Sequence, residues 1–174
     1  TGPELASAHA IESYLRGLNR DYADAIRHGD AAIALAAPLA QHATLATAHA
    51  SKGAALLFID PARGRAELAR ALAIAEGVED GGAAMADVYM ILGVVSGELH
   101  EFDAAERHLA DGIAFARSRD LDRLTGSMEA WQALCDVYRG RWDLAAERAG
   151  TVLAREAMGS TNRVMALVAL GRLR

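Results

Sequence analysis

The sequence predicts an all-helical chain in which antiparallel helix pairs stack side by side as an α-solenoid, and three observations support this fold class. First, a residue pattern recurs at a pitch of about forty residues, which is typical of repeat arrays. Second, 52% of the 174 residues are hydrophobic but only 5% are aromatic, so Ala and Leu supply most of the apolar surface. Third, the three prolines leave long stretches of helix-forming residues uninterrupted.

Each repeat carries an aromatic residue or Pro, followed three places later by a small residue. These pairs are Tyr22/Ala25, Pro61/Gly64, Phe102/Ala105 and Trp142/Ala145. Upstream of each pair lies a second pattern, large-x-x-large-small-x-x-large. It begins at Ile11, His49, Tyr89 and Trp131 in the four units, and Leu167-x-x-Leu170-Gly171 begins a fifth. The two patterns predict a first and a second helix in every unit.

Nine helices are expected from these patterns. The first helices of the pairs are predicted at 4–18, 41–58, 83–97, 121–139 and 161–174, and the second helices at 21–37, 61–76, 102–117 and 142–155. Asp60 and Pro61 form a start signal, because an Asp side chain accepts from free backbone N–H groups and Pro needs no N–H at the first helical position. Gly77 is the corresponding stop signal.

We therefore expect one domain, 1–174, with four helix pairs and one further helix. The repeats lie near 4–38, 41–77, 83–117 and 121–157, with a partial fifth at 161–174. Gly53, Gly93 and Gly171 share the small position, where the absence of a side chain would let two helices approach closely. Cys135 takes this position in the fourth unit and is expected to be a buried packing residue. Because the chain starts without Met and stops inside a repeat, it is interpreted as a piece of a longer protein.

The combined pattern resembles the tetratricopeptide repeat, which reads W-x2-L-G-x2-Y, then A-x3-F, then P. Ala105-x-x-x-Leu109 and Pro38 fit its later part, whereas Lys52 stands where Leu is expected and Gly64 replaces Ala. The pitch is also longer than the usual thirty-four residues. Longer units of this kind resemble the repeat region of MalT-type, LuxR-family bacterial regulators, which are large signalling ATPases with a DNA-binding end. The resemblance implies a right-handed superhelix.

Motifs that carry catalysis or bind metals are not evident. The pair His100-Glu101 lacks a second His four residues after the first, where Ala104 stands. His42 and His49 could share a helix face, but no further metal ligands can be placed. The sequence contains no G-x4-G-K-[ST] loop and no recognisable nucleophile with its base. We expect no catalytic residues, no cofactor and no metal site.

Charge and hydropathy exclude two further classes. A net charge of −5, with basic residues interleaved among acids, disfavours nucleic-acid contact by this segment. No apolar run approaches the roughly eighteen residues that a membrane span needs, and no signal peptide is visible. The single cysteine, Cys135, cannot form an internal disulfide and fits a reducing compartment. A cytoplasmic location is therefore expected.

A superhelix of stacked pairs would present the first helix of each pair on a concave groove. The resemblance to tetratricopeptide repeats places the groove-facing residues at set offsets from the small position of that helix. They are His9, Glu12, Arg16 and Asn19 in the first unit, Thr47, Leu57 and Phe58 in the second, Asp87, Met90 and Glu98 in the third, and Glu129, Gln132, Asp136 and Arg139 in the fourth. This mixture of charged, amide and apolar side chains suits a peptide or a polyhydroxylated ligand.

The expected function is a non-catalytic sensor or scaffold module of a MalT-like regulator, which binds a small-molecule inducer or a protein partner. The alternative is a free-standing tetratricopeptide adaptor that binds a peptide segment of a partner. The first predicts that the gene encodes a nucleotide-binding domain before this segment and a helix-turn-helix after it, and the second predicts neither. A third hypothesis is an enzyme with an unrecognised site, in which Ala at Glu129 and Asp136 would abolish turnover. A homodimer through the uncapped ends is also open.

Overall fold

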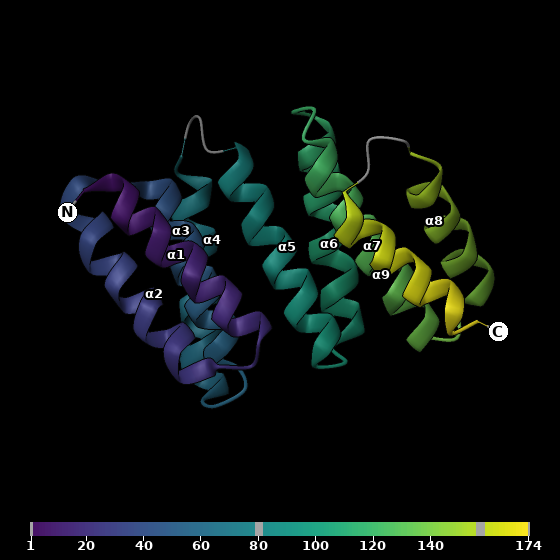
Figure 1. Cartoon of the computed structure of the whole chain (residues 1–174), viewed down its shortest axis with the longest axis horizontal. Helices are drawn as coiled ribbons and strands as arrows, with labels where there is room; N and C mark the ends of the chain where they lie inside the picture. Colours follow the sequence, from purple (N-terminus) through teal and green to yellow (C-terminus); the bar gives the residue numbers. More distant parts are fainter. Residues whose placement is uncertain (1, 79–81, 156–158, 174) are drawn as a thin grey trace. The chain divides into compact units, whose positions relative to one another are not determined.

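The computed structural model describes residues 2–78, 82–155 and 159–173, and every regular element in these ranges is a helix (Figure 1). The elements are α1 (Pro3–Leu18), α2 (Tyr22–Ala36), the 3-10 turn η1 (Ala37–Leu39), α3 (His42–Leu56), α4 (Pro61–Glu76), α5 (Gly82–Glu98), α6 (Phe102–Arg117), α7 (Asp122–Tyr138), α8 (Trp142–Ala154) and α9 (Ser160–Gly171). The predicted all-α class is confirmed, and each predicted helix is present. The sequence patterns did not indicate η1, which contains Pro38.

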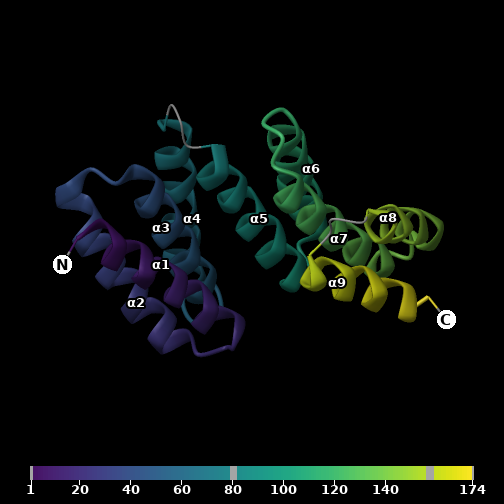
Figure 2. The ribbon, with the colours of Figure 1, turned by 45° about the horizontal axis from the view of Figure 1, so that its top comes forward.

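The chain divides into two compact units, the first ending at Ile91 and the second beginning at Leu92. In the first unit, α1 packs against α2 and α3, α2 against α3, and α3 against α4 (Figure 2). In the second unit, α6 packs against α7, and α7, α8 and α9 contact one another. Helices that are neighbours in sequence therefore pack as neighbours within each unit. The single domain 1–174 and the right-handed solenoid stay predictions.

Local signals explain the helix boundaries. The Asp60 carboxylate accepts a hydrogen bond from the backbone N–H of Arg63 at 3.2 Å, and Gly77 follows the last residue of α4, as predicted. The turns after α1, α5 and α7 contain a residue in the left-handed region, namely Arg20 with φ 62°, His100 with φ 60° and Gly140 with φ 74°. Non-glycine residues enter this region at a cost. Ala40 and Asp120 are also in this region, whereas the turn after α3, which the structure describes in full, has no such residue.

Small residues dominate the buried contacts of each unit. One cluster in the second unit consists of Ala130, Ala133, Ala149, Val152, Ala166 and Ala169. Two clusters in the first unit join Ala6, Ala36 and Leu45, and Ala10, Ala32 and Ala48. Ala105, Leu109, Ile113 and Ala116 recur at helical spacing on α6 and are all buried, so they form its apolar packing face. Alanine side chains bring the helix backbones close together, so many small contacts take the place of one large core.

The small repeat position does allow close helix approach at two of its three glycines. A Cβ at Gly93 would lie 2.5 Å from Leu109 Cδ2, and one at Gly53 would lie 3.0 Å from Leu68 Cγ. At Gly171 the expectation was wrong, because a Cβ there would meet nothing within 4 Å. Cys135 is buried as predicted, and burial raises the pKa of its thiol to about 11, with a smaller contribution from Asp136. None of the helices in the described ranges combines the length and apolarity that crossing a membrane requires.

Candidate ligand-binding site

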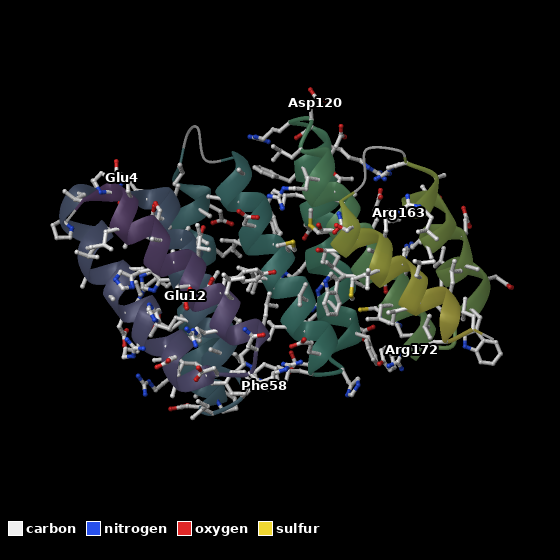
Figure 3. The ribbon with its side chains drawn as sticks, viewed as in Figure 1. Glu4, Glu12, Phe58, Asp120, Arg163 and Arg172 are labelled. Carbon is white, nitrogen blue, oxygen red and sulfur yellow. The ribbon has the colours of Figure 1, made fainter. Side chains whose placement is uncertain are left out.

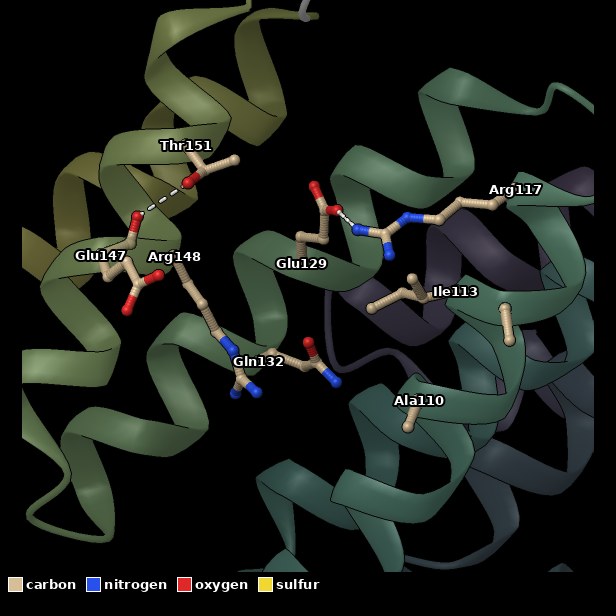
Figure 4. A pocket seen from close by; sticks show the side chains of 9 residues that line it. Ala110, Ile113, Arg117, Glu129, Gln132, Glu147, Arg148 and Thr151 are labelled. Carbon is tan, nitrogen blue, oxygen red and sulfur yellow. Dashed lines mark hydrogen bonds and ion pairs between the residues drawn. The ribbon is translucent and has the colours of Figure 1, made fainter.

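The candidate site is a pocket in the second unit, enclosed by α6, α7 and α8 (Figure 4). Its volume is about 400 Å³, which falls within the range of small-molecule sites, and it is partly open to solvent. It is lined by Ala110, Ile113, Ala114 and Arg117 of α6, Glu129 and Gln132 of α7, and Glu147, Arg148 and Thr151 of α8. The pocket therefore has an apolar wall on α6, formed by Ala110, Ile113 and Ala114, and polar groups from Arg117 at the end of α6 and from α7 and α8.

One face of α7 carries the polar groups next to this pocket. Glu129, Gln132 and Asp136 are spaced three and four residues apart, so they lie on the same side of the helix. All three are buried, although charged and amide groups are rarely buried without partners. The neighbouring helices must therefore compensate the two carboxylates.

Two guanidinium groups surround the carboxylate of Glu129. Arg117 of α6 donates from Nη2 to Oε1 at 2.6 Å, and Arg155, which follows α8, places Nη1 2.6 Å from Oε2 and donates from Nη2 to Oε1 at 3.0 Å. One negative charge is thus shared by two positive charges. Among the residues that the structure describes, this end of the pocket carries one surplus positive charge.

Asp136 lies deeper and is fully buried. Its Oδ2 accepts from Arg148 Nη1, and its Oδ1 lies 2.6 Å from Arg141 Nη2 in an ion pair that lacks hydrogen-bond alignment. A hydrogen bond to Glu106 raises the pKa of Arg141, and the charge of Asp136 acts in the same direction. Arg148 is therefore fixed at the pocket wall by a buried carboxylate beneath it.

Gln132 differs from these charged neighbours. Its side chain is only 8% exposed, and Figure 4 shows its amide pointing into the pocket. Within the described ranges of the chain, this amide has no hydrogen-bond partner. The amide atoms themselves are not among the fully buried polar atoms that lack a partner, so they face the open pocket. Gln132 thus offers two donors and one acceptor to a ligand in the pocket.

The structure gathers three of the four residues predicted in the fourth unit and adds others from the second helices. Arg139 instead pairs with Asp103 at 2.9 Å and Glu106 at 3.0 Å, and it does not line the pocket. Sequence reasoning missed Arg117, Glu147, Arg148 and Thr151, because it searched only the first helix of each pair. Acidic residues at buried positions of a first helix were the available signal, since they require basic partners on the adjacent second helices.

The predicted residues of α1 form local polar contacts in the first unit. His9 Nδ1 lies 2.8 Å from His28 Nδ1 on α2, and Arg16 Nε donates to Glu12 Oε1 at 2.7 Å (Figure 3 labels Glu12). Asn19 is exposed just after the last turn of α1. Exposed pairs such as Glu12 and Arg16 contribute little to stability.

The residues predicted in the second and third units are scattered among different environments. Thr47 donates to its own helix, at Ala43 O, over 3.2 Å. Leu57 is 6% exposed, and its Cδ2 would lie 2.9 Å from a Cβ on Gly64, so it packs in the contact between α3 and α4. Phe58 is partly exposed and stacks on Tyr22 with ring centroids 4.9 Å apart. Asp87, Met90 and Glu98 are half-buried on α5.

A second buried polar cluster lies on α3 and explains why Lys52 departs from the repeat pattern. Lys52 Nζ lies 2.8 Å from Asp30 Oδ1 and 3.2 Å from Glu67 Oε1, and His49 Nδ1 lies 2.5 Å from Glu67 Oε2. Burial alone would raise the pKa of Glu67, but the hydrogen bonds with His49 and Lys52 outweigh it and lower that pKa. In the part of the chain that the structure describes, no group of three His, Cys, Asp or Glu residues could hold a metal ion.

Comparisons of this chain with protein-family models, with curated proteins and with solved structures gave no match. The resemblance to tetratricopeptide repeats and to MalT-type regulators therefore rests on the sequence patterns alone.

Proposed function

We propose that the chain is a non-catalytic binding module whose pocket between α6, α7 and α8 receives a polar ligand or a segment of a partner protein. One observation carries the proposal: polar side chains from α6, α7 and α8 converge on one open pocket, and three of them, Arg117, Glu129 and Arg148, are held in ion pairs. Such a combination of an apolar wall and a few placed polar groups is characteristic of ligand sites.

The ion pairs also support the proposal because they hold the pocket in one shape. Glu129 fixes Arg117 and Asp136 fixes Arg148, so two long side chains have already lost much of their rotamer freedom. A ligand that uses their remaining N–H groups pays less ordering entropy on binding. The buried carboxylates on α7 thus act as positioning groups for the guanidinium groups at the pocket wall.

The wider role that we propose is sensing by a MalT-like, LuxR-family regulator in the cytoplasm, with the pocket bound by an inducer or a protein partner. The repeated patterns and the recurring left-handed turn residues support a repeat array of that kind. A free-standing adaptor for a partner's peptide is the alternative. The neighbouring coding sequence separates them: a nucleotide-binding domain before and a helix-turn-helix after this segment support the regulator, and their absence supports the adaptor.

Binding itself is tested by panning a random-peptide library on the chain and by a thermal-shift screen of sugars and small metabolites. We expect a ligand whose affinity falls at least tenfold in the variant Ala114→Trp, because Ala114 is exposed on the α6 wall and a large ring there fills the pocket. Ala146→Trp is the matched control, since Ala146 is exposed on α8 outside the pocket lining. Ligands that bind wild type and both variants equally, or no ligand from either screen, would contradict the proposal.

A further inference from the structure

The structure points to an extended peptide segment as the ligand of this pocket, with an acidic side chain beside the backbone amide that pairs with Gln132. This inference rests on the proposed function, because it identifies the class of ligand that the same pocket takes.

The first step is the chemistry of the Gln132 amide. A primary amide offers two N–H donors and one carbonyl acceptor, so it is satisfied by a group that both donates and accepts along one edge. A residue in an extended peptide presents its own N–H and C=O in that way, as it does toward the neighbouring strand in an antiparallel sheet. Since the residue is only 8% exposed and its amide is unpaired in the described chain, a ligand that reaches the amide from the pocket can form both hydrogen bonds without breaking one within the described chain.

The second step is the surplus charge beside that amide. Within residues 2–78, 82–155 and 159–173, Arg117 and Arg155 share only the carboxylate of Glu129, which lies three residues before Gln132 on α7. Side chains at this spacing have Cβ atoms about 5–6 Å apart. The Arg117 side chain is 62% exposed, so its other N–H groups are open to a ligand carboxylate. A peptide amide held by Gln132 therefore lies within reach of a cation that its own acidic side chain can pair with.

The third step is the shape and polarity of the remaining wall. Ala110, Ile113 and Ala114 expose only small or branched apolar groups on the α6 side. They leave room for a backbone and provide no polar partners for a ring of hydroxyl groups. Glu147 adds a negative charge on α8, which directs an acidic side chain toward the Arg117 end instead. Charge, pairing and the apolar wall thus favour an acidic peptide over a polyhydroxylated ligand.

The test is an NMR titration of the whole ¹⁵N-labelled chain with three probes. Binding is monitored through the side-chain NH₂ signals of Gln132. The probes are N-acetyl-glutamate N-methylamide, its uncharged glutamine counterpart and glucose. We expect the glutamate probe to shift these signals and to bind at least tenfold more tightly than the glutamine probe. Gln132→Leu should weaken both dipeptide probes at least fivefold, as judged from the signals of Thr151 and Ala114. Arg117→Gln should remove only the preference for the charged probe.

Each other result overturns the inference. Equal affinity for the two dipeptide probes would show that the acidic side chain is not recognised. Unchanged affinity in Gln132→Leu would show that the amide does not bind the probes. Glucose binding without dipeptide binding replaces the ligand class but leaves the proposed function intact. The proposed function fails only if the panning and thermal-shift screens also give no ligand that is sensitive to Ala114→Trp. Should Gln132→Leu not fold, the exposed-site variant Ala114→Trp must abolish the shifts caused by the glutamate probe.

Discussion

Helices α3 and α7 occupy corresponding places in the two units, and both bury polar side chains, but with opposite charge. On α3, the basic Lys52 and His49 face the acidic Glu67 of α4. On α7, the acidic Asp136 faces the basic Arg148 of α8. The repeat fixes which positions are buried, and each pair of helices then reaches charge balance in its own way.

The two regions also differ in the residue that stands at one shared repeat position. Gln132 and Ala50 occupy the same repeat position, because each directly follows the first residue of the upstream pattern, Trp131 in the fourth repeat and His49 in the second. Ala50 is fully buried, whereas the amide of Gln132 faces a pocket of about 400 Å³. The two units therefore place different residues at this shared position, a buried alanine in the first and a pocket-lining amide in the second.

The largest expected effect comes from removing the buried carboxylate of the second unit. We expect Asp136→Ala to lower the free energy of unfolding by about 3–5 kcal/mol, because Arg148 and Arg141 would lose a partner inside the protein. The matched control is Asp103→Ala, which removes a side chain that is 82% exposed and pairs with Arg139. This control should change stability by less than about 0.5 kcal/mol. Urea unfolding followed by circular dichroism measures both, and similar losses for the two variants would show that burial does not decide the effect.

A smaller loss of stability is expected when a side chain is added at a glycine that lies in a close helix contact of the first unit. A Cβ at Gly64 would lie 2.7 Å from the backbone nitrogen of Leu57, so Gly64→Ala should cost about 1–3 kcal/mol. In the second unit, Gly150 on α8 has nothing within 4 Å of such a Cβ, and Gly150→Ala should stabilise by up to about 1 kcal/mol. Thermal unfolding of the two variants should therefore shift in opposite directions. A stabilising Gly64→Ala would contradict the close approach of α3 and α4.

The glycine positions and the buried residues of the two units also show how much of the structure the sequence could predict. The sequence patterns predicted each α-helix of the described ranges, the cap at Asp60 and the buried role of Cys135, because helix periodicity and caps are local signals. It failed at Gly171, where the close approach that a small residue permits does not occur. Glu129, Gln132 and Asp136 were selected from their repeat positions, but their environment was not predictable. Which guanidinium group reaches which carboxylate depends on how the neighbouring helices α6, α7 and α8 pack against one another, and helix periodicity does not specify that packing.

The next effect distinguishes a paired polar group from an unpaired one. Ser13 of the first unit is fully buried and donates to Ala25 O at 2.8 Å, so Ser13→Ala should cost about 0.5–1.5 kcal/mol. Gln132→Leu removes an amide without a partner in the described chain, and we expect unfolding free energy to stay the same or to rise by up to about 1 kcal/mol. Urea unfolding compares them. A loss for Gln132→Leu as large as that for Ser13→Ala would mean that the amide is already paired.

The smallest expected effect is the acid response of the cluster on α3. Because the pKa of Glu67 is lowered from its ordinary value of 4.5, its contribution to stability is fully present above pH 4.5. It is lost as the pH falls through the lowered pKa, where the folded protein begins to take up the proton. The stability difference between wild type and Glu67→Gln should therefore narrow below pH 4.5. A difference that is constant from pH 7 to pH 3 would contradict the pairing of Glu67 with Lys52 and His49.

The most direct test of a binding site in the second unit is a map of backbone amide shifts over the whole chain, recorded with a peptide enriched by panning. The account predicts that shifts concentrate on the residues of α6, α7 and α8 that line the pocket, with Gln132 among the largest. It also predicts that the α3 cluster around Lys52 does not respond. Shifts centred on α3 and α4, with the pocket residues unchanged, would contradict it.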